Sequence, residues 1–361
     1  MKIVCVMRSL NMGGAQRQIT RLAVELKQAG HEVVMLPYRG GTFFLPLLEA
    51  NGVQVDTLPH RSGLIHLLTD MRDYLKAMQP DVVISYLIGP NTKLCAVHRL
   101  YPHFHLVVSE RSAYTHVTPS VFLRYLLYRE AEAIVPNSYA QEQFIRRHYP
   151  RLVGRTTTIT NFFDLEALRP LENPVHHTRQ RLIVTTARVA RQKNVLRYIR
   201  AVAELQRRGL DFHVEWYGVA SHGLYYRLCQ RAIRRQRLEG MFVLREKVAN
   251  VVEVYHSADI FCLPSLYEGT SNALGEALSC GLPVACSRVS DNPIYVAEGR
   301  NGVLFNPRKV SSIVDGLEQM LRLTDDELTA YGRQSRATAE VHFDKRVFVQ
   351  KYEQLLSQFK A

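Results

Sequence analysis

The residues best suited to do chemistry are two carboxylates, Glu268 and Glu276, in the stretch 265–284. This stretch joins the end of an apolar run to a helix that we expect to begin near Asn272. The free N–H groups at the start of such a helix form a natural site for a diphosphate. Glu268 precedes the helix and Glu276 lies on it, so the two acids would contact different parts of one ligand. The pattern therefore predicts a site for a phosphorylated ligand that two separate acids orient.

Two cations and a glycine turn fit the same chemistry. Arg188 and Lys193 follow an apolar run, and paired cations stabilise a leaving group that gains negative charge. Gly13 and Gly14 follow the first apolar run of the chain, and a glycine turn lets backbone amides approach a phosphate. Taken singly, surface cations and glycine turns are ordinary features, so the prediction depends on their combination with the acids.

The elements that must position these residues alternate between buried strands and amphipathic helices, and the alternation starts twice. We expect strands at 3–7, 31–36, 53–58, 81–86 and 105–109, and again at 182–187, 212–217, 242–244, 260–263, 283–287 and 302–305. Such alternation with short connections predicts α/β domains with parallel sheets covered on both faces. The polar, proline-containing segment 161–178 interrupts it and reads as a linker.

These patterns predict two domains, which suits a chain of 361 residues. We expect an N-terminal domain at 1–163 and a C-terminal domain at 164–343. The last segment, 344–361, carries its apolar residues on one helical stripe, and Asp344 is a candidate cap. We expect this helix to pack back on the first domain.

The composition narrows the class of protein. The formal net charge is +13, and the segment 222–247 holds seven Lys/Arg against two Glu. A basic surface suits nucleic acid, anionic lipid or a phosphorylated substrate. The helix expected at 224–237 is either a site for anionic lipid head groups or a solvated arginine-rich face.

Cysteine usage and hydropathy indicate the compartment. The six cysteines form no Cys-x-x-Cys pair and have no His cluster beside them, so we expect neither zinc nor disulfides, and a reducing compartment. We find no signal-peptide pattern and no run of the ~18 apolar residues that a membrane span needs. We therefore expect a cytoplasmic protein, or one on the cytoplasmic face of the inner membrane.

The stretch 265–284 closely resembles the Glu-x7-Glu motif of the family 4 glycosyltransferases, which adopt the GT-B fold. Both acids match, as do Gly269, the Asn272 position and the ending 281–283. In the expected order, 13–17 resembles the family's glycine loop and 188–194 its Arg…Lys pair. The segments 136–138 and 159–161 look like its end-of-domain landmarks.

This resemblance implies an α/β GT-B architecture, in which two Rossmann-like domains face each other across a cleft. The N-terminal domain would lie on the acceptor side, and the C-terminal domain would bind a nucleotide sugar. The implied activity is that of a retaining glycosyltransferase that moves a hexose or N-acetylhexosamine, with UDP as the expected carrier. The expected acceptor is a cell-surface glycan or its lipid-linked oligosaccharide precursor.

The resemblance also implies roles for individual residues. Glu268 would contact the donor sugar, Glu276 the ribose hydroxyls, and Arg188 and Lys193 the diphosphate. The expected catalytic residues are Glu268, Arg188, Lys193 and Arg111. The expected donor-binding residues are Gly13, Gly14, Arg188, Lys193, Val248, Glu268, Gly269, Ser271, Asn272, Ala273, Leu274 and Glu276. Cations and helix amides would stabilise the departing nucleotide, and no Asp-x-Asp occurs, so we expect a metal-independent enzyme without a cofactor.

The chain departs from the family pattern in two regions. After 107–109, where many members have a His near the reacting carbon, the sequence reads Glu-Arg-Ser; either Arg111 takes that polar role, or His116 or His98 does. The rim of the nucleotide site lacks one glycine at 217–220 and another at 244–246, so the sequence does not identify the base of the bound nucleotide.

Three other classes of protein fit the sequence less well. A sugar-nucleotide epimerase shares the fold, but its signature histidines and acids do not align here. A dinucleotide dehydrogenase would need Gly-x-Gly-x-x-Gly after a strand, and none occurs. A nucleic-acid binder would explain the charge but not the acids. We therefore expect a nucleotide sugar, a glycan or lipid-linked acceptor and an anionic membrane as partners, and no nucleic acid.

Overall fold

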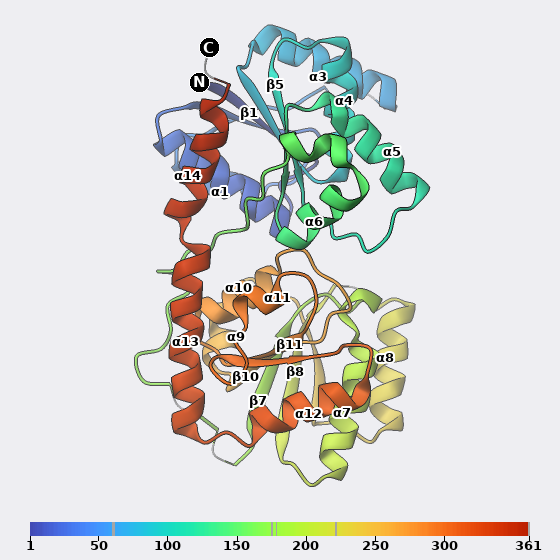
Figure 1. Ribbon diagram of the computed structural model, residues 1–361, viewed down its shortest axis with the longest axis vertical. Helices are drawn as coiled ribbons and strands as arrows, with labels where there is room; N and C mark the ends of the chain where they lie inside the picture. Colours follow the sequence, from blue (N-terminus) through green and yellow to red (C-terminus); the bar gives the residue numbers. More distant parts are fainter. Residues whose placement is uncertain (60–61, 175, 178, 221, 360–361) are drawn as a thin grey trace. The chain divides into compact units, whose positions relative to one another are not determined.

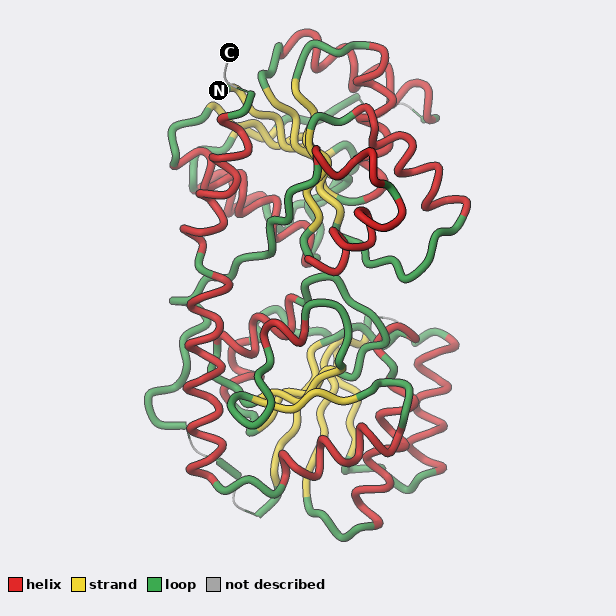
Figure 2. Tube along the Cα trace, viewed as in Figure 1, coloured by secondary structure: helices red, strands yellow, loops and turns green. Residues whose placement is uncertain are grey.

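The structure is a computed structural model that describes residues 1–59, 62–174, 176–177, 179–220 and 222–359. The chain divides into two compact units (Figure 1). The first comprises Met1–Asn161 with Lys345–Ala361, and the second comprises Phe162–Asp344. Each unit is built on a parallel sheet that has six strands within the described residues. Figure 2 shows each sheet (yellow) flanked by helices (red), as expected for an α/β fold.

The sheet of the first unit has the strand order β3-β2-β1-β4-β5-β6. Its strands are β1 (Lys2–Met7), β2 (Glu32–Pro37), β3 (Gln54–Val55), β4 (Val82–Tyr86), β5 (His105–Glu110) and β6 (Ala133–Pro136). The central strands are almost wholly buried and apolar because helices cover both of their faces. The order of the strands reverses between β1 and β4, which defines the edge where such sheets bind ligands.

The helices of the first unit include one from the far end of the chain. They are α1 (Gly14–Gln28), α2 (Leu45–Ala50), α3 (Leu64–Met78), α4 (Ile88–Leu100), α5 (Pro119–Leu127), α6 (Tyr139–His148) and α14 (Lys345–Ser357), with 3-10 turns η1 (Tyr128–Glu130) and η2 (Pro150–Arg155). The apolar stripe of α14 is buried, and the Tyr352 hydroxyl lies 2.8 Å from that of Tyr86 on β4. The C-terminal helix therefore belongs to the core of this unit.

The second unit repeats the plan with the order β12-β11-β10-β7-β8-β9. Its strands are β7 (Arg181–Thr186), β8 (Phe212–Val219), β9 (Phe242–Glu246), β10 (Ile260–Leu263), β11 (Val284–Ser287) and β12 (Gly302–Phe305). Its helices are α7 (Val195–Arg207), α8 (Leu224–Arg235), α9 (Val252–His256), α10 (Asn272–Ser279), α11 (Asn292–Tyr295), α12 (Val310–Leu321) and α13 (Asp325–Phe343), with the 3-10 turn η3 (Arg191–Lys193). One core contains α7, α8 and α12, and another contains α9, α10 and part of α13. The strand order reverses between β7 and β10.

The predicted α/β class with two parallel sheets is confirmed, and the differences are local. The strand expected at 53–58 shortens to the two residues of β3. Just beyond it, the Asp56 N–H still donates to the Met35 carbonyl of β2 at 3.0 Å, while the Asp56 carboxylate accepts hydrogen bonds from Gln54 and Tyr74. The helix expected at 344–361 begins at Lys345 and ends at Ser357. Asp344 is the extended residue between α13 and α14, while 360–361 lie outside the described residues, as do 175 and 178 of the expected linker.

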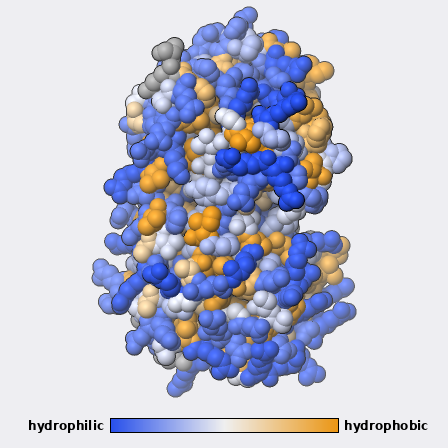
Figure 3. Space-filling view, viewed as in Figure 1, coloured by the Kyte–Doolittle hydropathy of each residue, from blue (hydrophilic) through white to orange (hydrophobic). Residues whose placement is uncertain are grey.

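Surface hydropathy is mixed. On the face seen in Figure 3, hydrophobic residues are scattered among hydrophilic ones. Within the described part of the chain, no helix is long and apolar enough to cross a bilayer.

Candidate active site

The two acids of the motif lie at the carboxyl edge of the second sheet, beside the reversal of strand order. The loop after β10 carries Glu268, and α10 begins at Asn272. Ser271 caps this helix, because its side chain accepts a hydrogen bond from the Leu274 N–H at 3.4 Å. The cap fixes the direction of the first turn, whose remaining N–H groups are suited to bind an anion.

The loop after β7 is joined directly to the loop after β10. The Leu266 N–H donates to the Gln192 carbonyl at 2.8 Å, and the Gln192 amide donates to the Tyr267 carbonyl at 2.9 Å. This pairing places Lys193 against Glu268, and the two side chains form an ion pair while only 13% and 7% exposed. The predicted cation and the predicted acid therefore lie together although 75 residues separate them in the sequence.

Glu276 is held by a second chain of hydrogen bonds. The acid is 5% exposed on α10, and the Tyr255 hydroxyl donates to its Oε2 at 3.1 Å. The Thr186 hydroxyl, at the end of β7, lies 2.6 Å from the same tyrosine oxygen. Burial, and then the charge of Glu276, raises the pKa of Tyr255 well above its ordinary value. Tyr255 therefore remains a protonated donor and fixes the orientation of the carboxylate.

Close packing between Gly275 and the ring of Phe163 holds α10 in place. A Cβ on Gly275 would lie closer than 3.0 Å to the ring of Phe163, which packs edge-on against Phe343. The glycine of the motif is therefore required for packing, because it lets the helix that carries Glu276 touch this aromatic pair.

The remaining predicted donor residues of the second unit line the same edge or its margin. Gly269, Asn272 and Ala273 are half-buried around the start of α10, and Val248 packs against the core beneath it. Arg188 follows β7 and is exposed, and its side chain has no hydrogen bond or ion pair to any described residue. It is thus free to contact an anion.

Gly218, the glycine that does occur at 217–220, is required by its surroundings. Gly218 has a φ of +143°, and a Cβ there would lie closer than 3.0 Å to the Ala187 carbonyl. The end of β8 therefore packs directly against the chain that leads to Arg188. The missing second glycine lies outside this contact, at the exposed Ala220.

Gly13 and Gly14 lie in the first unit, at the start of α1 and so at the carboxyl edge of its own sheet. Gly13 is extended and half-buried, and Gly14 is exposed as the first helical residue. A Cβ on Gly13 would meet the side-chain amide of Gln16 closer than 3.0 Å. The first turn of α1 is therefore compact and lacks a side-chain cap, which leaves N–H groups for another partner.

Arg111 lies at the carboxyl end of β5 and is engaged on several sides. Its guanidinium stacks on the Tyr86 ring, 3.9 Å from the centroid. It also donates to Asn161 Oδ1 at 2.7 Å and to the Tyr352 hydroxyl at 3.4 Å. Arg111 therefore joins two strand ends, the last residue of the first unit before the linker, and α14.

The two alternative histidines are separated by their positions. His98 is buried in the last turn of α4, where it bonds the Phe104 carbonyl at 2.9 Å before β5 begins. That position is the amino edge of the sheet, opposite Arg111. His116 is exposed in the loop after β5, at the carboxyl edge. Only Arg111 and His116 share the edge that the prediction requires.

Sequence reasoning missed a buried acid beside Arg111. Glu110 accepts hydrogen bonds from the Ser112 N–H at 3.0 Å and from the hydroxyls of Tyr128 at 3.2 Å and Tyr114 at 3.4 Å. Burial raises the pKa of Glu110. The network ties β5 to η1 and to the loop that follows the strand. Tyr255 and Thr186 were missed as well, because neither belongs to a motif.

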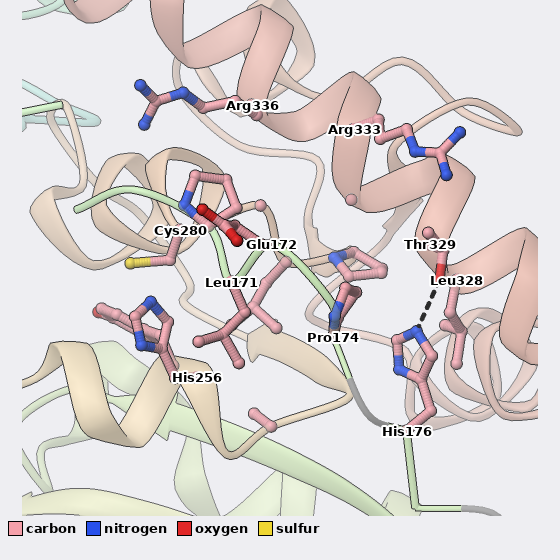
Figure 4. Close-up of a pocket in the computed structure, with 17 residues that line it drawn as sticks. Leu171, Glu172, Pro174, His176, His256, Cys280, Leu328, Thr329, Arg333 and Arg336 are labelled. Carbon is pink, nitrogen blue, oxygen red and sulfur yellow. Dashed lines mark hydrogen bonds between the residues drawn. The ribbon is translucent and has the colours of Figure 1, made fainter. Parts of the chain in front are cut away.

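A separate cavity of about 260 Å³ lies near the amino ends of β10 and β11. Figure 4 shows its lining, with Leu171 and Pro174 from the linker, His256 from α9, and Arg333 and Arg336 from α13. The Arg336 guanidinium donates to three backbone carbonyls, those of Leu165, Leu168 and Ser279. The cavity therefore lies where the linker is fastened to α13, and neither acid of the motif lines it. Among the described residues, no three His, Cys, Asp or Glu side chains form a group suited to a metal ion.

Comparison with known proteins identifies the class. Residues 12–167 match the family described as Glycosyltransferase Family 4, and residues 180–323 match the one described as Glycosyl transferases group 1. These matches, with the two parallel sheets, define a glycosyltransferase of the GT-B type. The chain belongs to the family 4 glycosyltransferases, and the predicted family, fold and enzyme class are confirmed.

Individual relatives agree with this assignment. The chain is 25% identical over 359 residues to the Campylobacter jejuni "N-acetylgalactosamine-N,N'-diacetylbacillosaminyl-diphospho-undecaprenol 4-alpha-N-acetylgalactosaminyltransferase", covering 93% of this chain and 94% of the relative. Among solved structures, Anabaena HepE in complex with UDP-glucose superimposes with a TM-score of 0.86 at 18% identity, covering 99% and 100% of the two chains. A Rickettsia africae glycosyltransferase gives 0.84 at 14% identity, covering 99% and 98%.

Proposed function

We propose that the protein is a retaining glycosyltransferase that moves a hexose or N-acetylhexosamine from a UDP-sugar to a lipid-linked oligosaccharide precursor or cell-surface glycan. The observation that carries the proposal is the pair of buried acids at one sheet edge. Glu268 is paired with Lys193, and Glu276 is oriented by Tyr255. Burying two carboxylates beside a helix start costs stability, which is expected where a ligand must be oriented.

In this proposal, the donor lies along the carboxyl edge of the second sheet. The ribose hydroxyls donate to Glu276, whose carboxylate Tyr255 already aligns. The diphosphate takes N–H groups at the start of α10, the exposed Arg188 and Lys193, while Glu268 accepts hydrogen bonds from hydroxyls of the sugar. Lys193 thus exchanges part of its contact with Glu268 for the diphosphate when the donor binds. Gly269, Ser271 and Val248 shape the surrounding surface.

The chemical step follows from these positions. The acceptor hydroxyl attacks C1 of the sugar from the side of the leaving group. The new glycosidic C–O bond forms as the bond from C1 to the β-phosphate oxygen breaks. The β-phosphate takes the hydroxyl proton, and Arg188, Lys193 and the helix amides stabilise its charge, so that neither a metal nor a cofactor is needed. Arg111 contributes a polar group from the end of β5, and Gly13 and Gly14 offer backbone amides from the first unit.

The acceptor and the location are proposed from the relatives. Two Campylobacter jejuni relatives carry names that specify a saccharide on diphospho-undecaprenol as the acceptor. A lipid-linked diphosphate of this kind requires an enzyme that works at a membrane surface. We place the protein on the cytoplasmic face, in peripheral contact with anionic lipid.

A two-stage experiment tests this proposal. A thermal-shift screen of nucleotide sugars selects the donor, because a ligand that binds the native state raises the melting temperature by mass action. Proton NMR of the transfer product then reports the configuration at C1. The expected result is stabilisation by a UDP-sugar and a product that keeps the donor's configuration. An inverted product would contradict the retaining mechanism, and an epimer formed without acceptor would identify an isomerase instead.

A further inference from the structure

The outer face of α8 combines arginines with exposed leucines. Leu224 is 68% exposed and Leu228 is 36% exposed, one turn apart. On the opposite face, Cys229 and Ile233 are buried in the core beside α7. The helix contains no acidic residue. The exposed residues that share the outer face are Leu224, Arg227, Leu228, Arg231, Arg234 and Arg235.

The charge on this face is not neutralised within the protein. The side chains of these four arginines form no hydrogen bond or ion pair with any residue that the structure describes, and the same is true of the Arg237 side chain just beyond the helix. Elsewhere in the second unit, Arg208 pairs with Glu318 and Arg245 pairs with Glu215. Like charges at this spacing repel and destabilise a helix. A persistent group of them is therefore expected to meet an anionic partner.

The leucines indicate which anionic partner this is. A nucleic-acid backbone would contact the arginines but offer nothing to Leu224 and Leu228. A bilayer surface accommodates both, since the guanidinium groups reach the lipid phosphates and the leucines reach the boundary of the acyl chains. We propose that the outer face of α8 docks the second unit on an anionic membrane.

The position of α8 within the second unit would bring the donor-binding edge of the sheet close to the membrane. The helix begins shortly after β8 ends at Val219, so the start of α8 lies at the carboxyl edge of the sheet (Figure 1). The loops that carry Lys193 and Glu268 follow β7 and β10 at the same edge. Docking through α8 would hold the edge that binds the donor near the head groups, where a lipid-linked diphosphate is found. The usefulness of this contact rests on the proposed acceptor, but the contact itself can be measured without turnover.

Co-sedimentation of the full chain with vesicles tests the proposal. Phosphatidylcholine vesicles with and without phosphatidylglycerol are compared for the wild-type protein and for Arg231→Gln/Arg235→Gln. We expect binding only where phosphatidylglycerol is present, and a loss of about thirtyfold in the double variant, from ~1 kcal/mol for each cation near such a surface. Leu224→Ser/Leu228→Ser should also weaken binding, whereas a purely electrostatic contact would leave it unchanged.

A matched control removes the same charge from the first unit. Arg147 and Arg151 are exposed and have no described partner, so Arg147→Gln/Arg151→Gln should bind vesicles nearly as the wild type does. An equal loss in both arginine pairs would overturn the proposal in favour of non-specific charge. Full binding by the α8 variants, with loss in Phe122→Ser/Leu123→Ser on the exposed face of α5, would move the membrane contact to the first unit.

Two further measurements separate this inference from the proposed function. Duplex RNA that displaces the wild type and the leucine variant from vesicles equally well would indicate a nucleic-acid surface instead. Calorimetry with UDP should give the wild-type affinity in every α8 variant. If the protein binds UDP and transfers the sugar but does not bind vesicles, the proposed membrane contact of α8 is wrong and the glycosyltransferase assignment stands.

Discussion

The ion pair between Lys193 and Glu268 provides the sharpest test of the site. In the structure, these two nearly buried groups are each other's ion-pair partner. If Lys193 must also serve the diphosphate, the acid competes with the donor for the cation. Replacing Glu268 by Gln should therefore free Lys193, strengthen the binding of UDP and still slow transfer, because the sugar loses the acceptor that orients it.

The burial of Lys193 and Glu268 sets how much unfolding free energy each substitution should cost. Lys193→Met leaves a carboxylate that is only 7% exposed without its cation, and breaking a buried pair in this way costs about 3 to 5 kcal/mol of unfolding free energy. Glu268→Gln keeps an amide oxygen for Lys193 and should cost about 1 to 3 kcal/mol. The double variant removes both charges, so its cost should fall below the sum of the single costs by roughly 2 kcal/mol.

Urea unfolding of the four proteins measures this coupling, and calorimetry with UDP measures the competition. We expect UDP to bind Glu268→Gln about tenfold more tightly than it binds the wild type, which corresponds to about 1.4 kcal/mol released from the pair. If the loss of unfolding free energy in the double variant equals the sum of the losses in the two single variants, Lys193 and Glu268 do not interact in solution. UDP binding that weakens in Glu268→Gln would refute the competition between acid and diphosphate.

Three other substitutions test separate contacts of the site. Tyr255→Phe removes the hydroxyl that donates to Glu276, so UDP affinity should fall about tenfold or more, as calorimetry would report. Gly275→Ala places a Cβ against the ring of Phe163 and should cost about 1 to 3 kcal/mol in urea unfolding, while an unchanged midpoint would deny the close approach. Burial raises the pKa of Glu110, so the folded state binds this proton more readily than the unfolded state, and stability should fall as pH rises from the ordinary carboxyl pKa through the raised one. Glu110→Gln should flatten that decline in unfolding titrations between about pH 4 and pH 8, and an identical pH profile would count against the shift.

The fold class could be predicted because its cause is local. Apolar runs with helices between them predict parallel strands, and such strands carry ligand loops at their carboxyl ends. This geometry also explains how Lys193 and Glu268 meet, since β7 and β10 are neighbours at the reversal of strand order. The strand order itself was not predicted, because apolar runs do not specify which strands pair.

Contacts that depend on tertiary structure could not be foreseen. Arg111 was considered only as a polar group near the reaction, yet its guanidinium also bonds Tyr352, which is 241 positions away on α14. Tyr255 lies on the short helix α9 and has no motif around it, although its hydroxyl orients Glu276. The pairing of distant side chains depends on packing that no spacing in the sequence encodes.

The most direct test of the central claim is calorimetric titration of UDP and 2′,3′-dideoxy-UDP into the wild type and Glu276→Gln. If Glu276 binds the ribose hydroxyls, the wild type should prefer UDP by about ten- to a hundredfold, from a charge-assisted hydrogen bond of about 1.5 to 3 kcal/mol. The variant keeps only a neutral amide oxygen as acceptor, so it should bind UDP more weakly and prefer it by less than about tenfold. A variant that keeps the full preference for UDP would show that this acid does not hold the ribose.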